Sequence, residues 1–138
     1  MMINIKLDKF AVAPTRGHAT DAGLDLRSPI DTVVPANGNV CIDTGIHIDV
    51  PYEFAGFIKS KSGLNVKHNI TADGVIDTGY TGSIIVKLYN HGDEDYKIEK
   101  GDKIAQLVLV KIALPGLGLA HIENDDARDN NGFGSTGR

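Results

Sequence analysis

Apolar and polar residues alternate with a period of two in short runs along most of the chain. Near the N-terminus, Ile3, Ile5 and Leu7 alternate with polar residues, which predicts a half-buried strand. No stretch of ten or more residues has a convincing helical periodicity. Closely spaced short strands with turn residues between them are typical of a sandwich, barrel or jelly roll, so we predict an all-β fold. Further strands are predicted at residues 24–26, 32–34, 39–42, 46–50, 54–58, 96–98 and 104–112.

The middle of the chain predicts a β-hairpin. An apolar run enters the sequence Asp-Thr-Gly-Tyr at residues 77–80, and a second alternating run, residues 83–90, leaves it. Gly79 suits the positive φ that a short turn often requires. Asp77 and Tyr80 flank the turn, where a carboxylate and a phenol can form one wall of a small-molecule site. Taken alone, these residues also fit an ordinary turn, with Asp77 opening it and Tyr80 covering an edge of the core.

Composition limits the class of protein and its partners. A chain of 138 residues fits one domain and buries roughly two-thirds of its unfolded surface, so it needs no disulfide or metal to fold. Its 41% hydrophobic residues and 16 glycines suit an all-β protein rich in turns. The formal net charge of −4 predicts neither nucleic acid nor an anionic membrane as partner.

Compartment is predicted from what the chain lacks. Cys41 is the single cysteine, so an intramolecular disulfide is impossible. The N-terminal residues contain no apolar stretch long enough for a signal peptide, and no run approaches the length of a membrane span. We therefore expect a cytoplasmic protein, or one of the host cytoplasm if a phage encodes it.

Two polar segments interrupt the first half of the strand pattern. Asp25 lies between two leucines of a predicted strand and so faces away from them. It is either a solvated carboxylate or one that orients the water shell of Mg²⁺. The segment 59–64 combines lysines, serines and a glycine, which suits either phosphate binding or an ordinary surface loop.

Two more polar features lie in the second half. Gln106 interrupts an apolar strand, and a buried amide without partners costs about 1–3 kcal/mol, so Gln106 is either at an edge or aimed at a ligand. The glycine-rich end, residues 132–138, is ordinarily explained as disorder. Phe133, however, could stack on a flat ligand, worth about 1–3 kcal/mol. Arg128 could clamp the end of a phosphate chain with its planar fork.

Taken together and in this order, five segments resemble the five motifs of the trimeric dUTPases. The likeness covers essentially the whole chain, and its third and fifth motifs are highly specific. The matching segments are 22–26 (Ala-Gly-Leu-Asp-Leu), 61–64 (Lys-Ser-Gly-Leu), 74–80 (Gly-Val-Ile-Asp-Thr-Gly-Tyr), 101–107 (Gly-Asp-Lys-Ile-Ala-Gln-Leu) and 132–137 (Gly-Phe-Gly-Ser-Thr-Gly).

The resemblance implies an architecture and a reaction. Residues 1–127 would form a β-jelly roll, the dUTPase-like β-clip, and residues 128–138 a flexible glycine-rich tail that closes over the active site. The protein would be a homotrimer whose sites are shared between subunits. The implied reaction is Mg²⁺-dependent hydrolysis of dUTP to dUMP and pyrophosphate by water attack on the α-phosphorus. This reaction limits uracil in DNA and supplies dUMP for thymidylate synthesis.

The resemblance also implies a role for each matching residue. Asp77 matches the carboxylate that activates the attacking water. Tyr80 matches the ring that packs on the deoxyribose and leaves no room for a 2′-hydroxyl. Asp25 matches the aspartate near the hydrated Mg²⁺, which it would reach through water. The implied substrate-binding residues are Lys61, Ser62, Gly63 and Gln106 around the phosphates, Gly74, Val75 and Ile76 at the uracil, Arg128, Ser135 and Thr136 at the γ-phosphate, and Phe133 with Gly134 over the uracil.

Three of the five motifs depart from the family pattern. Lys61 stands where an arginine is usual, so a point charge replaces a bidentate fork. Gly79 stands where a second acid is usual, and Asp129 and Asn131 replace glycines before the tail motif. None of these changes removes a residue that the resemblance assigns to the chemical step.

Three alternatives remain open from the sequence. A dCTP deaminase, or the bifunctional relative, would carry a catalytic glutamate near Lys87, and its absence together with the intact tail motif argues against deamination. A regulatory role is a second alternative, because some phage dUTPases also bind repressor proteins, although no insertion separates the motifs here. The third is an inactive nucleotide-binding jelly roll.

Overall fold

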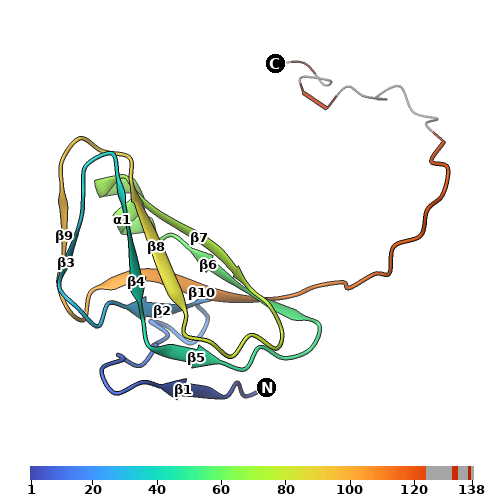
Figure 1. Ribbon diagram of the computed structural model, residues 1–138, viewed down its shortest axis with the longest axis horizontal. Helices are drawn as coiled ribbons and strands as arrows, with labels where there is room; N and C mark the ends of the chain where they lie inside the picture. Colours follow the sequence, from blue (N-terminus) through green and yellow to red (C-terminus); the bar gives the residue numbers. More distant parts are fainter. Residues whose placement is uncertain (124–131, 134–136, 138) are drawn as a thin grey trace.

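The structure is a computed structural model that describes residues 1–123, 132–133 and 137 (Figure 1). Its largest sheet has six antiparallel strands, and two ribbons of two strands flank it. The sheet order is β2 (Gly23–Arg27), β10 (Lys103–Lys111), β6 (Phe54–Lys59), β7 (Ile70–Ile76), β8 (Ile85–Asn90) and β4 (Asn39–Asp43). The ribbons pair β1 (Ile5–Leu7) with β5 (Ile46–Ile48), and β3 (Thr32–Val34) with β9 (Tyr96–Ile98).

Burial follows the alternation that predicts the strands. In β8, Val86 and Leu88 are fully buried, whereas Tyr89, the residue after Leu88, is exposed. Alternate residues point to opposite faces of a strand, so one face of the curled sheet packs inward against the ribbons. The all-β prediction is confirmed, and the sheet and its ribbons form a β-jelly roll. The largest fully buried apolar side chains are Leu26, Val34, Ile42, Ile46, Val50, Ile70, Ile84, Val86, Leu88, Ile98 and Ile104.

The N-terminal strand forms as predicted, but its predicted burial is wrong. Ile5 and Leu7 are 44% and 40% exposed, although β1 pairs with β5 through Ile5 and Ile48. The period-two pattern predicts the strand because it is local. It contains no information about whether a second layer covers the apolar face.

One short helix interrupts the strands. Helix α1 (Ser62–His68) begins inside the segment for which the sequence predicted a surface loop or a phosphate site, and none of its residues is buried. It ends at Asn69, whose φ of 56° is left-handed and whose N–H donates to carbonyl oxygens of the last turn. A seven-residue helix without an apolar stripe gives no helical periodicity, which is why the sequence pattern did not predict it.

The chain leaves the sheet after β10. Residues 112–123 lead away from the jelly roll without regular secondary structure, and Leu117 and Leu119 are fully exposed (Figure 1). The predicted boundary between residues 127 and 128 lies outside the described residues. In the described part of the chain, no helix is both long and apolar enough to cross a membrane.

Candidate active site

The central hairpin opens before it reaches its loop. Residues 70–72 of β7 pair with residues 88–90 of β8, but residues 73–76 pair with residues 56–59 of β6 instead. The predicted pairing of the two arms is therefore confirmed for residues 70–72 and 88–90, and the arms separate before they reach the turn. The opening holds a pocket of about 210 Å³ lined by Ile58, Gly74, Val75, Ile76, Asp77, Tyr80, Ile84 and Ile85.

A turn at the mouth of this pocket presents Asp77 and Tyr80 together. The Tyr80 N–H donates to the Asp77 carbonyl oxygen at 3.2 Å. Gly79 has a φ of 86°, the left-handed value that the third residue of a type II turn requires. The positive φ predicted for Gly79 is confirmed, and both flanking side chains line the same pocket, as the sequence predicted.

The Tyr80 ring folds back over the backbone of the same loop. Its hydroxyl donates to the Ser83 carbonyl oxygen at 2.9 Å. A Cβ on Gly82 would lie 2.5 Å from the Tyr80 hydroxyl oxygen, so only glycine leaves room for the ring in this position. Gly82 is thus a site residue that the sequence pattern did not single out, although its place two residues after Tyr80 was visible.

Side chains from neighbouring segments hold the loop between β7 and β8. The Thr78 hydroxyl donates to the Pro51 carbonyl oxygen at 3.0 Å, three residues before β6. The Ser83 hydroxyl donates to the Asp43 carboxylate at the end of β4. That bond, followed by one from the Gly45 N–H, holds the pKa of Asp43 below its ordinary value. The loop that presents Asp77 and Tyr80 is therefore fixed at both ends.

A second polar cluster forms around Asp25 on β2. The Asp25 side chain is 6% exposed and accepts hydrogen bonds from Lys61 Nζ at 2.6 Å and Lys103 Nζ at 2.9 Å. Burial alone would raise the pKa of Asp25, but the two ammonium groups outweigh it and hold the pKa below its ordinary value. Asp25 is thus a buried, paired carboxylate, and the prediction that it is solvated is wrong. Lys103 is a second cation that the sequence pattern did not single out.

Gln106 lies beside this cluster. Strand β10 has neighbours on both sides, so the prediction of an edge position is wrong. Gln106 is paired in register with Asp25, and its amide nitrogen donates to the Ser60 carbonyl oxygen at 3.0 Å. A Cβ on Gly23 would lie 2.3 Å from the Gln106 amide oxygen, so Gly23 makes room for this side chain.

The Asp25 cluster fits a hydrated metal better than a directly bound one. Each carboxylate oxygen already accepts from an ammonium group, and both are shielded from solvent. A carboxylate offers about four lone-pair positions, so oxygens can still accept from a metal-bound water. Within the described residues, no group of three or more His, Cys, Asp or Glu side chains could hold a metal ion.

The two clusters are separated along the same pair of strands. Asp77 lies beyond Ile76, which pairs with Gly56, whereas the Asp25 cluster lies beyond the other end, where Asp73 pairs with Lys59. Three residues of strand correspond to about 10 Å. Within one chain, the carboxylate of Asp77 and the two ammonium groups therefore belong to different parts of the surface.

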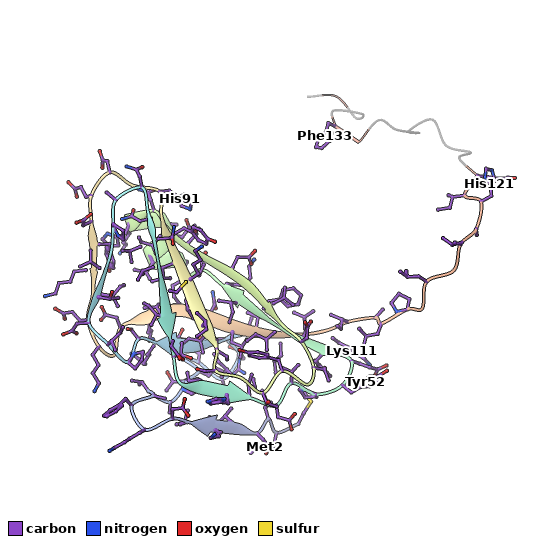
Figure 2. The ribbon with its side chains drawn as sticks, in the orientation of Figure 1. Met2, Tyr52, His91, Lys111, His121 and Phe133 are labelled. Carbon is purple, nitrogen blue, oxygen red and sulfur yellow. The ribbon has the colours of Figure 1, made fainter. Side chains whose placement is uncertain are left out.

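The remaining predicted residues fall into three groups. Ser62 begins α1, and Gly63 follows it with open space around its Cα. Phe133 is fully exposed and lies away from the sheet (Figure 2). The predicted positions outside the described residues are Arg128, Gly134, Ser135 and Thr136.

Together, fold and geometry define a β-jelly-roll protein with a pocket that presents a carboxylate and a phenol from one loop, and with two cationic groups on another surface. Comparison with known proteins gives the family. A model of the dUTPase family matches residues 9–137, and the chain belongs to this family.

Curated relatives and solved structures agree with that assignment. The chain is 44% identical over 133 residues to a probable deoxyuridine 5′-triphosphate nucleotidohydrolase of Schizosaccharomyces pombe, covering 96% of this chain and 95% of that protein. It is 45% identical to the corresponding protein of Paramecium bursaria Chlorella virus 1, covering 96% and 94%. The structure of the dUTPase of Staphylococcus bacteriophage 80alpha with dUPNHPP aligns with a TM-score of 0.88 at 31% identity, covering 99% of both chains.

Proposed function

We propose that this protein hydrolyses dUTP to dUMP and pyrophosphate. The observation that carries the proposal is the open hairpin, because it places Asp77 and Tyr80 together at the mouth of a pocket of about 210 Å³. A carboxylate fixed beside a pocket can accept a proton from an attacking water, which is the role that hydrolysis at phosphorus requires. The relatives named as deoxyuridine 5′-triphosphate nucleotidohydrolases support the same reaction.

In the proposed mechanism, Asp77 orients a water and takes its proton as the oxygen attacks the α-phosphorus. The turn bond from Tyr80 N–H to the Asp77 carbonyl and the anchor from Thr78 to Pro51 restrict the loop on which Asp77 lies. A restricted base loses little orientational freedom in the transition state, which favours the attack. Pyrophosphate leaves as the new oxygen–phosphorus bond forms.

Selection of the base and sugar falls to the same pocket. Residues 74–76 of β7 lie opposite Ile84 and Ile85 without pairing to them, so their backbone groups can meet the edge of uracil. The ring of Tyr80, folded over Gly82, would pack against the deoxyribose. A 2′-hydroxyl would then have to enter space that the ring fills, which disfavours UTP.

The phosphates would bind the cationic cluster. Each lysine ammonium has three N–H donors, and the bonds from Lys61 and Lys103 to Asp25 use one from each. The other donors can meet phosphate oxygens, together with the hydroxyl of Ser62 and the amide of Gln106. Mg²⁺, when bound to the phosphates, would neutralise their charge, and Asp25 would accept hydrogen bonds from its water shell.

A homotrimer is part of the proposal, in keeping with the trimeric dUTPases that the motifs resemble. The separation of about 10 Å along the strands between Asp77 and the Asp25 cluster leaves the carboxylate and the cations apart in one chain. A second copy that placed its cluster against the first copy's pocket would complete the site, and closed symmetry would repeat this arrangement. The tail, residues 128–138, would then come from a third copy.

The reaction is tested by measuring pyrophosphate release from dUTP, UTP, dCTP and dTTP on the wild type and on Asp77→Asn. We expect turnover of dUTP alone, and a loss of about a hundredfold or more in the variant, whose side chain cannot take up the proton. Ammonia release from dCTP would favour the deaminase alternative. UTP turnover comparable to that of dUTP would contradict the role given to Tyr80.

The shared site is tested by subunit mixing. Asp77→Asn chains and Lys61→Ala/Gln106→Ala chains are unfolded together and refolded, and each is refolded alone as the control. If each site takes these residues from two different chains, random mixing leaves about one site in four intact. Recovery of about a quarter of wild-type turnover is expected, and a mixture no more active than its components would contradict a shared site.

A further inference from the structure

His47 joins the N-terminal segment to the loop that carries Tyr80. It lies on β5, between the buried Ile46 and Ile48, and its ring points to the opposite face. Its Nδ1 lies 2.7 Å from the carbonyl oxygen of Thr81, the residue after Tyr80. Its Nε2 lies 3.1 Å from a carboxylate oxygen of Asp8, just after β1.

Both ring nitrogens of His47 therefore face oxygens that can only accept hydrogen bonds. A neutral imidazole carries one N–H, and only the imidazolium carries two. When His47 is protonated, it can donate to both the Thr81 carbonyl and the Asp8 carboxylate. When it is neutral, it can donate to only one of them. The bond to Thr81 and the pairing with Asp8 both raise the pKa of His47 above its ordinary value, which agrees with this geometry.

The charged groups around His47 have mixed signs. From β1 and the residue that follows it come Lys6, which is paired in register with His47, and Asp8. From the end of β4 comes Asp43, and from the residue after β5 comes Asp49, which lines the same pocket as His47. The loop contributes the uncharged carbonyl of Thr81. One nearby cation and three nearby carboxylates favour the imidazolium.

The atom that His47 holds is well placed to control the Tyr80 ring. Thr81 lies between Tyr80 and Gly82, and the ring rests on Gly82 with no room to spare. Thr78 and Ser83 anchor the two sides of the loop. The Ile84 N–H donates to the Ile46 carbonyl oxygen of β5 at 2.8 Å, and the Thr81 carbonyl is the loop's contact with the His47 side chain. A displacement of Thr81 would therefore move the backbone on which the ring packs.

We propose that His47, as an imidazolium, is a positioning residue that holds the loop with Asp77 and Tyr80 in its active geometry. The assignment rests on the proposed hydrolysis of dUTP. Because the pKa of His47 is raised, its contribution is complete below pH 6.5, the ordinary value for histidine. The contribution then declines as pH rises through the higher pKa of the folded protein.

The first test compares kcat/KM for dUTP between wild type and His47→Gln from pH 5.5 to pH 9. The glutamine amide can donate to the Thr81 carbonyl oxygen, but it is neutral and presents no charged donor to the Asp8 carboxylate. We expect the wild type to exceed the variant by about three- to tenfold at the acid end, the effect of one hydrogen bond. The ratio should approach one at the alkaline end. A ratio that does not change with pH would overturn the proposal.

Two further variants separate this effect from general damage. Asp8→Asn removes the nearby charge but keeps an acceptor oxygen, so the midpoint of the pH dependence should move to lower pH without vanishing. His91→Gln changes a histidine that contacts Thr71 instead. The ratio of kcat/KM between wild type and this variant should not change with pH. A midpoint unmoved by Asp8→Asn, or the same pH dependence in His91→Gln, would contradict the assignment.

A measurement without substrate distinguishes failure of this proposal from failure of the proposed reaction. NMR of the ¹⁵N-labelled protein should show two protonated ring nitrogens on His47 at pH 6, and the amide signals of Thr81 and Gly82 should titrate with the ring. If they titrate independently of it, the coupling is absent even in an enzyme that hydrolyses dUTP. If they titrate together but no pH supports dUTP turnover, the proposed reaction fails and the coupling stands.

Discussion

Asp25 and Lys61 form an ion pair of 2.6 Å, with an Asp25 side chain only 6% exposed. Lys103 contacts the second oxygen of the same carboxylate at 2.9 Å. Two lysine ammonium groups would repel each other without a carboxylate between them. Asp25 therefore keeps two cations together at the surface that we propose binds the triphosphate.

Replacement of Asp25 by asparagine should destabilise the fold in a pH-dependent way. At neutral pH the variant turns an NH₂ group toward one ammonium, and we expect a loss of about 1–3 kcal/mol in the free energy of unfolding. The pKa of Asp25 is lowered, so its stabilisation is present above the ordinary value of 3.8 and is lost as pH falls through the lower folded value.

Urea unfolding of both proteins at pH 7 and pH 3 measures this difference. Asp93→Asn, at an exposed carboxylate, makes the same change of net charge and should have little effect at either pH. A deficit in Asp25→Asn that is as large at pH 3 as at pH 7 would contradict the ion-pair explanation.

Removal of the Lys61 charge should weaken substrate binding more than it weakens the fold. Lys61→Ala leaves Asp25 paired with Lys103 but removes one charged donor from the phosphates. We expect KM for dUTP to rise about ten- to hundredfold, the effect of a hydrogen bond to a charged group. Lys61→Arg, whose fork can reach both Asp25 and a phosphate, should be at least as active as wild type.

Lys100→Ala is the matched control for Lys61, because Lys100 is an exposed lysine in the turn before β10. Steady-state kinetics on the three variants decide the matter. If Lys61→Ala and Lys100→Ala have the same KM as wild type, Lys61 is not a phosphate ligand.

Alanine at Gly82 should impair discrimination between dUTP and UTP. The added Cβ would lie 2.5 Å from the Tyr80 hydroxyl oxygen, so the ring must move. The backbone conformation of Gly82 is not of the left-handed kind that favours glycine, so the effect is steric. We expect the ratio of kcat/KM for dUTP to that for UTP to fall toward the value measured for Tyr80→Ala.

The double variant shows whether Gly82 acts through Tyr80. Gly82→Ala/Tyr80→Ala should discriminate no worse than Tyr80→Ala alone, because residues that act through one contact are not additive. Gly116→Ala, with open space around the glycine, is the control. Independent, additive effects would show that Gly82 does not position the ring.

The strands could be predicted from the sequence because alternate burial is a local pattern, as Val86 and Leu88 in β8 illustrate. The turn at Gly79 could also be predicted, because the residue types that favour a turn are a local signal as well. The burial of Asp25 could not, because its partners Lys61 and Lys103 come from the segment before α1 and from β10. Nothing adjacent to Asp25 in the sequence indicates that two cations meet there.

The opening of the hairpin likewise depends on a distant strand. Residues 73–76 leave β8 because β6 offers them a second partner, and this exchange creates the pocket. Local residues predicted the turn itself, since Asp, Thr and Gly favour turns, but they contain no information on where the two strands separate. The motifs that resemble the dUTPases identified Asp77 and Tyr80, whereas Gly82, Lys103 and His47 became visible only through their contacts in space.

Phe133 provides a prediction in which activity and stability should separate. Its side chain is fully exposed in the chain, so its removal gives up no packing and should leave the free energy of unfolding unchanged. If the ring stacks on the uracil, Phe133→Ala should raise KM for dUTP about 5- to 150-fold, the range for one base on one aromatic ring. Phe133→Tyr keeps the ring and should stay near wild type, whereas Phe133→Leu keeps only the apolar bulk and should resemble alanine. Because stacking requires a flat π-face, a leucine variant with wild-type KM would show that the residue acts through its size alone.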